Sequence, residues 1–355
     1  MEKAVKARLD AIQFAEPQFF KNIAIIPLIA SSDGTLKYQT LGEALATQNV
    51  LINEVSNAGS VPELMVVNRG KESVLLIDGE ELAGAKQNRV LNTSILLKEV
   101  CETKIPVSCT EQGRWSYTSK FFSHSGNIMA HKSRSRKTSS VHSYLESSGS
   151  YRSDQGEVWA NIAELHFKSS TNSPTSAMSD VYKARDEDLR KCDEIFKPVA
   201  NQIGLLVFIG GKPSGVDLVS RVAAYGKLHQ NLVRSYALEA LIESGLPSQP
   251  STEGPQSTDP AQFTAQARQF LDEITAAEEH QFPSIGHGTD YRYRSGPTPS
   301  RSTPQHGSTI CGTALVHENE VIHAAFFRLE EPSAATAQGI ANVPPYRSRW
   351  RRLFQ

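Results

Sequence analysis

The sequence has few cysteines, almost no excess of charge and no long apolar run, and each shortage excludes a class of protein. Its four cysteines include no CxxC pair, which argues against a disulfide-stapled scaffold and a structural zinc site. The 37 basic and 38 acidic residues leave a formal net charge of −1, so no global field attracts nucleic acid or an anionic membrane. No run reaches the ~18 apolar residues of a membrane span, and the N-terminus lacks the apolar stretch of a secretory signal. These absences predict a cytoplasmic protein with reduced thiols.

The chain nevertheless has enough apolar residues for a core. They make up 39% of its 355 residues, which excludes a wholly disordered protein. The first third contains five or six short strand-like runs, among them residues 22–30, 61–68 and 103–109. Strands and helices do not alternate there as a parallel sheet requires. We therefore predict an α+β fold whose N-terminal part, residues 20–117, is a mainly-β sandwich or barrel.

The rest of the chain predicts a second part with helices and strands. Residues 118–156 are basic and rich in serine, which predicts a long mobile loop. Residues 157–330 predict an α/β part that packs on the first and returns a closing β-hairpin, over 309–327, to the sheet. Residues 246–260 are rich in proline and serine, which predicts a linker or surface loop, and residues 331–355 predict a basic tail.

Two polar clusters follow apolar strands and form the candidate site. The first, residues 78–89, is longer than a hairpin needs, and the second covers residues 108–115. If the strands before them are antiparallel neighbours, the clusters meet at one end of the sheet. Arginine binds phosphate as a bidentate fork and tryptophan offers a stacking face, which suits a nucleotide-like ligand. The candidate residues of the two clusters and of the strand between them are Glu80, Glu81, Lys86, Gln87, Arg89, Asn92, Gln112, Arg114 and Trp115.

Other chemistries remain open for these residues. The charged side chains can instead pair with one another on the surface. A metal needs several ligands, but Glu80 and Glu81 are adjacent and point to opposite faces of a strand. His317 and His323 lie on opposite arms of the expected hairpin and could meet, yet no HxH or HxxxH pair exists, so no metal site is predicted. Cys109 fits a buried small residue better than a nucleophile.

The sequence contains no established nucleotide or nucleophile motif. GxSxG, Walker A and Rossmann fingerprints are all absent. Residues 210–215 superficially resemble a phosphate loop, but they lack the GK[ST] ending and Pro213 removes a donor. We interpret this segment as a tight turn, with Asp217 capping the helix that follows.

Residues 76–92 and 105–115, two long and specific motifs, resemble a known family signature. The family is the ARG and rhodanese-phosphatase-superfamily-associated protein domain, where ARG stands for ADP-ribosylglycohydrolase. Later matches are Gly210-Gly211, residues 234–238 and the hairpin over 312–328. The resemblance covers most of residues 20–330, with segments 118–156 and 246–260 looking expanded.

The resemblance implies a role near NAD or ADP-ribose metabolism, but it supplies no reaction and no cofactor. It also implies partners of the ADP-ribosylglycohydrolase, rhodanese or phosphatase type, while no membrane or nucleic-acid partner is expected. The first hypothesis is a protein that senses or sequesters ADP-ribose or a related NAD-derived nucleotide. The second is a hydrolytic or transfer enzyme on such a ligand, with Glu80 or Glu81 as general acid–base and Arg89 and Arg114 on the diphosphate. A scaffold without a small ligand is the third.

Overall fold

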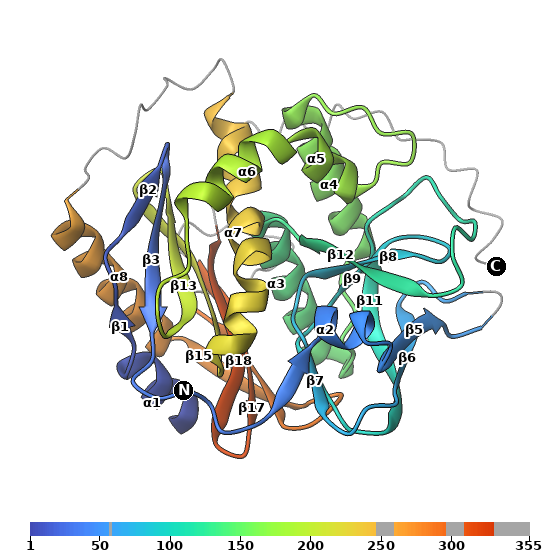
Figure 1. The fold of residues 1–355 in the computed structure, drawn as a ribbon, viewed down its shortest axis with the longest axis horizontal. Helices are drawn as coiled ribbons and strands as arrows, with labels where there is room; N and C mark the ends of the chain where they lie inside the picture. The colour runs from blue at the N-terminus through green and yellow to red at the C-terminus, as the bar shows by residue number, and fades with distance from the viewer. Residues whose placement is uncertain (57–58, 246–258, 296–308, 330–355) are drawn as a thin grey trace.

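A computed structural model describes residues 1–56, 59–245, 259–295 and 309–329 (Figure 1). The predicted tail at 331–355 and the predicted linker, up to residue 258, lie outside the described residues. The described chain is an α+β fold, as the sequence predicts, with a β-rich N-terminal part. Its strands form a nine-stranded, a six-stranded and a three-stranded sheet.

The largest sheet is antiparallel throughout and joins the two ends of the chain. Its strands are β1 (Gln13–Phe14), β2 (Gln18–Phe20), β3 (Ile23–Ile29), β13 (Gln202–Ile209), β14 (Lys212–Val219), β15 (Glu278–Pro283), β16 (Thr289–Arg294), β17 (Thr309–His317) and β18 (Glu320–Leu329). They run in the order β1-β3-β13-β14-β18-β17-β16-β15, and β2 pairs with β3. The predicted hairpin, β17 and β18, therefore returns to the sheet, where β18 pairs with β14.

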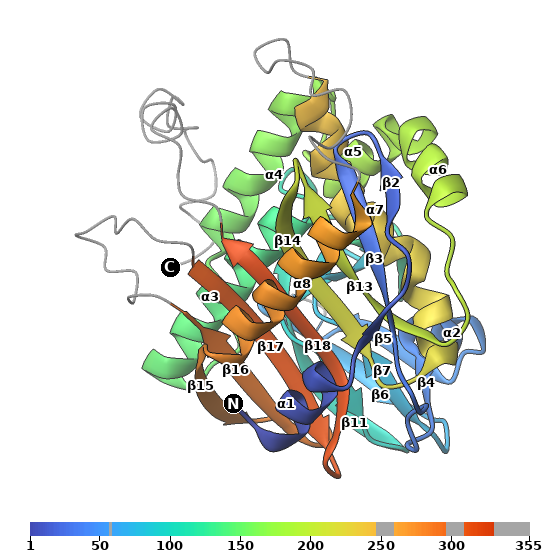
Figure 2. The same ribbon diagram turned by 90° about the vertical axis from the view of Figure 1, so that its left-hand side faces the viewer.

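Helices cover both faces of this sheet. Helices α1 (Lys3–Asp10) and α8 (Pro260–Thr275) lie over one face, as Figure 2 shows. Helices α3 (His131–Ser148) and α7 (Val222–Ser244) pack on the other side. Because successive strand residues point to opposite faces, Ile23 and Ile25 join the core beneath α7, whereas Ala24 and Ile26 join the core beneath α8.

The six-stranded and three-stranded sheets form the β-rich N-terminal part. The larger contains β5 (Val50–Glu54), β6 (Glu63–Asn68), β8 (Glu80–Gly84), β9 (Arg89–Leu91), β11 (Cys101–Cys109) and β12 (Phe122–Ile128). The smaller contains β4 (Tyr38–Thr40), β7 (Ser73–Leu76) and β10 (Ile95–Leu97), with β4 parallel to β7. The two sheets share an apolar core with helix α2 (Leu41–Ala46), as expected for a sandwich or barrel. Helix α2 begins with a capping box between Thr40 and Glu43.

The boundary predicted at residue 20 does not separate two sheets. Strands β2 and β3 belong to the first third of the sequence, yet they pair with each other and β3 pairs with β13 in the nine-stranded sheet. The mainly-β part therefore begins after β3. Helices α4 (Gln155–Ser169), α5 (Met178–Ala184) and α6 (Asp186–Ile195) complete the described fold.

The prediction of a loop over residues 118–156 is wrong. This segment contains β12, the whole of α3 and the start of α4. Polar side chains recur along α3 at helical spacing and are buried, because they find charged partners on other elements. The buried residues on this face of α3 include two apolar ones and are Arg134, Lys137, Thr138, Val141, His142 and Leu145. Gly149 then ends the helix in a left-handed conformation, with φ 65°.

Candidate functional site

Asp78, in the first polar cluster, is the centre of a buried network of charges. It follows β7 and receives hydrogen bonds from three side chains of α3. Arg134 Nε donates to Asp78 Oδ2 over 3.2 Å, Thr138 Oγ1 donates to the same oxygen, and Lys137 Nζ donates to Oδ1. Burial alone raises the pKa of Asp78, but Lys137 and Arg134 bring it below its usual value. Asp78 is therefore a carboxylate that holds α3 against the β-rich part.

Asp217 extends this network to the nine-stranded sheet. The Arg134 guanidinium binds it as a fork, with Nη1–Oδ2 and Nη2–Oδ1 distances of 3.0 and 2.8 Å. Tyr236 of α7 donates to Asp217 Oδ2 over 2.7 Å. His323 lies 3.5 Å from Asp217 through Nε2 and 2.8 Å from Ser94 through Nδ1. The network thus links the β-rich part, the nine-stranded sheet, α3 and α7 through side chains that are withdrawn from solvent.

Two expectations about these residues are wrong. Asp217 caps no helix, because it lies within β14 and faces Arg134. His317 and His323 do not meet: His323 contacts Asp217, whereas the His317 ring stacks on His287 at 4.8 Å. The tight turn at Gly210 and Gly211 is present, with positive φ at both residues before β14 begins.

Glu80 and Glu81 point to different partners, as their adjacent positions predict. Glu80 Oε2 accepts the Ile77 backbone N–H over 2.8 Å, and its Oε1 lies 3.1 Å from His124 Nε2. Glu81 accepts from Thr110 Oγ1 over 2.8 Å and from Asn127 Nδ2 over 3.2 Å. Both glutamates are buried.

An irregularity in β12 creates these contacts. Between His124, opposite Leu82, and Ile128, opposite Glu80, β12 has two more residues than β8. Such bulges re-aim side chains and occur frequently beside active sites. Gly126, with φ 82°, occupies the bulge. It lets β12 present both His124 and Asn127 to the paired glutamates.

His124 is partly exposed, with 18% of its side chain accessible to solvent. Its burial lowers the pKa, but the hydrogen bond and charge of Glu80 raise it, with a net increase. The Gly126 backbone N–H donates to His124 Nδ1 over 3.2 Å. In the neutral ring, Nε2 therefore carries the proton and donates to Glu80. This is a carboxylate–imidazole pair, a combination of groups that general acid–base catalysis uses.

Arg89, Lys86 and Trp115 come together from both predicted clusters. Arg89 is fully buried, and its Cζ lies 5.5 Å from the centre of a Trp115 ring. Lys86 Nζ lies 5.4 Å from the centre of a Trp115 ring and 5.1 Å from the centre of the Tyr117 ring, although Lys86 itself is largely buried. Trp115 and Tyr117 are 36% and 51% exposed. Cations and aromatic faces are thus combined at one end of the six-stranded sheet, where β8, β9 and β11 end or begin.

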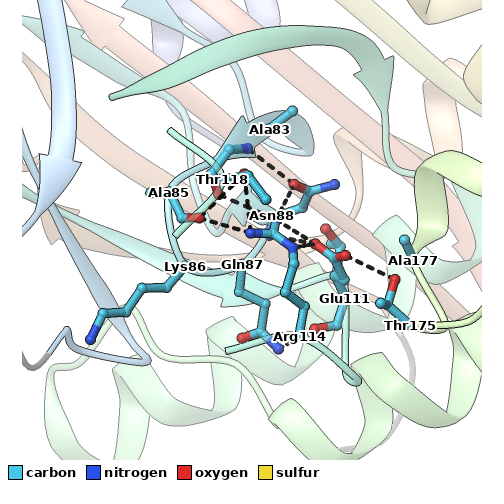
Figure 3. Close-up of polar contacts among 12 residues, drawn as sticks. Ala83, Ala85, Lys86, Gln87, Asn88, Glu111, Arg114, Thr118, Thr175 and Ala177 are labelled. Atoms are coloured by element: carbon cyan, nitrogen blue, oxygen red, sulfur yellow. Dashed lines mark hydrogen bonds and ion pairs between the residues drawn. The ribbon is translucent and has the colours of Figure 1, made fainter. Parts of the chain in front are cut away.

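Arg114 fastens the two clusters together from within (Figure 3). Its guanidinium lies 2.6 Å from Glu111 Oε2 and donates to Asn88 Oδ1 and to the Ala85 carbonyl. Burial alone raises the pKa of Glu111, but the hydrogen bond from Arg114 helps to hold it below its usual value. Lys86 points away from this group in the figure. This geometry favours an internal role for Arg114, and its binding of a ligand stays a prediction.

Replacing Arg114 with methionine is expected to lower the free energy of unfolding by about 1.5–3 kcal/mol, the typical contribution of hydrogen bonds to a charged group. Urea unfolding measures this change. Arg190→Met is the matched control, because the Arg190–Asp186 distance is also 2.6 Å but the Arg190 side chain is 71% exposed, against 13% for Arg114. The control should lose less than about 1 kcal/mol. Equal losses in the two variants would contradict an internal role for Arg114.

The remaining predicted site residues occupy three kinds of place. Gln87 bridges the clusters, donating to the Glu111 carbonyl and accepting from Arg89 Nη1 over 2.8 Å. Asn92 is buried, accepts from Ser108 Oγ and donates to the Tyr151 carbonyl, away from Trp115. Gln112 is exposed.

Two small residues close to the site pack tightly against other parts of the chain. A Cβ on Gly113 would lie 2.8 Å from Thr175 Cα, so this glycine permits a close contact between chain segments. Cys109 is buried, which raises the pKa of its thiol to about 11 and agrees with a buried small residue.

Comparison with known proteins identifies the family. The model of the ARG and Rhodanese-Phosphatase-superfamily-associated Protein domain matches residues 11–327. The chain belongs to this family. No curated protein and no solved structure matches it. The match spans both the nine-stranded sheet and the β-rich part, so the family domain includes the two as one unit.

The described part of this family member contains no helix that is long and apolar enough to cross a membrane. Sequence reasoning missed four of its functionally placed residues: His124, Asn127, Arg134 and Lys137. All four lie in residues 118–156, the segment predicted to be a loop. The available signal was the recurrence of polar residues at helical spacing from Arg134 onwards. By composition alone, the same segment is typical of a solvated stretch of chain.

Proposed function

We propose that this protein binds ADP-ribose or a related NAD-derived nucleotide and acts as a sensor or sequestering partner. The observation that carries the proposal is that two buried nitrogens of Arg89 lack a hydrogen-bond partner among the described residues. The two nitrogens are Nε and Nη2. Glu54 Oε1 forms an ion pair with Nη2 at 3.9 Å, beyond hydrogen-bond distance. Buried donors without acceptors are rare and favour an anionic ligand nearby.

The surface above Arg89 suits the other parts of a nucleotide. Trp115 and Tyr117 present exposed aromatic faces, and bases stack on such faces without needing a particular sequence or pattern of hydrogen bonds. Lys86 lies between the two rings and can contact a diphosphate. Reaching Arg89 requires Trp115, which covers it, to move aside. The ADP-ribosylglycohydrolase in the family name makes ADP-ribose the first ligand to test.

Trp115→Ala is expected to weaken the binding of ADP-ribose about ten- to hundredfold, because stacking contributes about 1–3 kcal/mol per base. Isothermal titration calorimetry measures the affinity directly. Phe121→Ala is the matched control: Phe121 is 39% exposed and its ring centre lies 5.2 Å from Lys120 Nζ, compared with 5.4 Å between Trp115 and Lys86 Nζ. The control should bind as the unmodified protein does. Absence of measurable binding by the unmodified protein, or equal loss in both variants, would refute the site.

A second candidate function is hydrolysis or group transfer on the same ligand. The observation that favours it is the strand register. Leu82 lies opposite both His124 and Arg89, and Glu80 is two residues from Leu82, so Glu80, His124 and Arg89 share one face of the sheet. The Glu80–His124 pair could then serve as general acid–base beside a bound diphosphate.

One experiment separates the two candidates. The protein is incubated with NAD, ADP-ribose and ADP-ribose phosphate, and chromatography looks for products while thermal melting looks for binding. Turnover that is lost in Glu80→Gln supports the enzyme. A melting shift without products supports the binding protein. If neither appears, both proposals fail and a scaffold without a small ligand is left.

A further inference from the structure

Helix α3 carries a second polar group, one turn beyond the residues that bind Asp78. His142 and Glu146 are four residues apart on this helix, so they lie on the same face. His280 of β15 meets them from a part of the chain 138 residues away. The three are a group of possible metal ligands within the described residues. None of them belongs to the site proposed for a nucleotide.

The three ligand atoms converge at distances that a metal ion would set. His142 Nε2 and His280 Nδ1 are 3.2 Å apart, His280 Nδ1 and Glu146 Oε1 are 2.7 Å apart, and His142 Nε2 and Glu146 Oε1 are 3.7 Å apart. Ligands at about 2.0–2.1 Å from a tetrahedral zinc ion are about 3.3 Å from one another. The mean of the three observed distances is close to this value.

Neighbouring groups hold two of the ligands in the orientation a metal requires. Glu278 Oε1 lies 3.2 Å from His280 Nε2 and can accept its proton, which leaves the Nδ1 lone pair directed at His142 and Glu146. Arg294 binds the Glu146 carboxylate through both Nη atoms, each at 3.1 Å, and so fixes the direction of Oε1.

We propose that His142, Glu146 and His280 bind a divalent transition-metal ion, with zinc as the best match to two imidazoles and one carboxylate. When no metal is bound, a proton on His280 Nδ1 can form the hydrogen bond that keeps these three atoms together. The metal takes the place of that proton. Imidazole ligands exclude magnesium and calcium, which prefer oxygen. The Glu146 and His280 side chains are 28% and 29% exposed, so water can reach the ion and complete its coordination. The ion would join α3 to the outermost strand of the nine-stranded sheet.

The test measures zinc affinity of the full chain after treatment with a chelator and its removal. Competition with a chromophoric chelator should show one saturable site, and cobalt substituted for zinc should give the visible absorption bands of a tetrahedral site. His280→Ala and Glu146→Gln, at partly exposed positions, should each weaken zinc binding at least about tenfold while circular dichroism stays unchanged. Glu278→Gln, which removes only the orienting charge, should weaken it about 10–100-fold.

A second histidine pair provides the matched control. His287 and His317 stack with ring centres 4.8 Å apart, and His287 lies 3.4 Å from Glu99. His317→Ala removes a histidine from this pair and should leave zinc affinity unchanged. The proposal is overturned if the unmodified protein binds no zinc at a single site. It is equally overturned if His280→Ala and Glu146→Gln, still folded, bind zinc as tightly as before.

Discussion

Replacing Arg134 with methionine is expected to lower the free energy of unfolding by about 3–5 kcal/mol, the usual cost of removing one partner from a buried ion pair. The guanidinium binds Asp217 through two hydrogen bonds and Asp78 through a third, and all three side chains are fully withdrawn from solvent. Methionine retains an unbranched side chain but leaves Asp217 without its cation. Urea denaturation followed by circular dichroism measures the loss.

Arg136→Met is the control for this prediction. Arg136 lies on the same helix two residues away, but its side chain is 36% exposed where it pairs with Glu164. Its loss should cost less than about 1 kcal/mol, as for other surface pairs. If the Arg134 variant is no less stable than this control, the buried network does not hold the two β parts together through α3.

Replacing Glu81 with glutamine is expected to change how stability depends on pH. Burial raises the pKa of Glu81 above the ordinary value of 4.5, although hydrogen bonds from Asn127 and Thr110 oppose this. Between the unfolded and the folded pKa, the folded protein keeps a proton that the unfolded chain releases. The contribution of Glu81 to the free energy of unfolding is therefore fully present below pH 4.5 and is lost as the pH rises through the folded pKa. The slope is about 1.4 kcal/mol per pH unit.

The measurement is urea unfolding at a series of pH values for the unmodified protein and the variant. Glutamine cannot titrate, so Glu81→Gln should lose this downward slope, and the difference between the two curves isolates Glu81 from the other carboxylates. Glu102→Gln, at an exposed position on β11, is the control and should leave the slope in place. Parallel curves for the unmodified protein and Glu81→Gln would show that Glu81 ionises as an ordinary glutamate. A raised pKa would fit a general acid, which must hold its proton near neutral pH.

Sequence patterns predicted the features that depend on neighbouring residues. The apolar runs at 22–30, 61–68 and 103–109 are strands, because β-branched and apolar side chains in short runs suit a buried sheet whichever sheet it is. The closing hairpin was predictable for the same reason. The meeting of the two polar clusters was also predictable, since each follows a strand: Gln87 contacts Glu111, and Arg114 contacts Asn88.

What each polar residue does with its charge was decided by tertiary structure. Arg114 looked suited to a diphosphate, yet its nitrogens bind Glu111, Asn88 and backbone carbonyls. The sequence alone does not distinguish ligand binding from internal pairing, because the role of Arg114 depends on which acceptors the fold brings within hydrogen-bond distance. Asp217 was interpreted as a helix cap for the same reason: its partner Arg134 is 83 residues away.

Helix α3 shows this division most clearly. Serine, arginine and lysine dominate its first ten residues. By composition such a segment remains in water, because burying unpaired charge costs free energy and few apolar groups are present to offset it. The sequence by itself determined the spacing of these side chains, which suits one face of a helix. Only the tertiary structure supplied Asp78 and Asp217 opposite that face, 56 and 83 residues from Arg134. Paired with them, the charges can be buried, and the segment becomes a helix of the core.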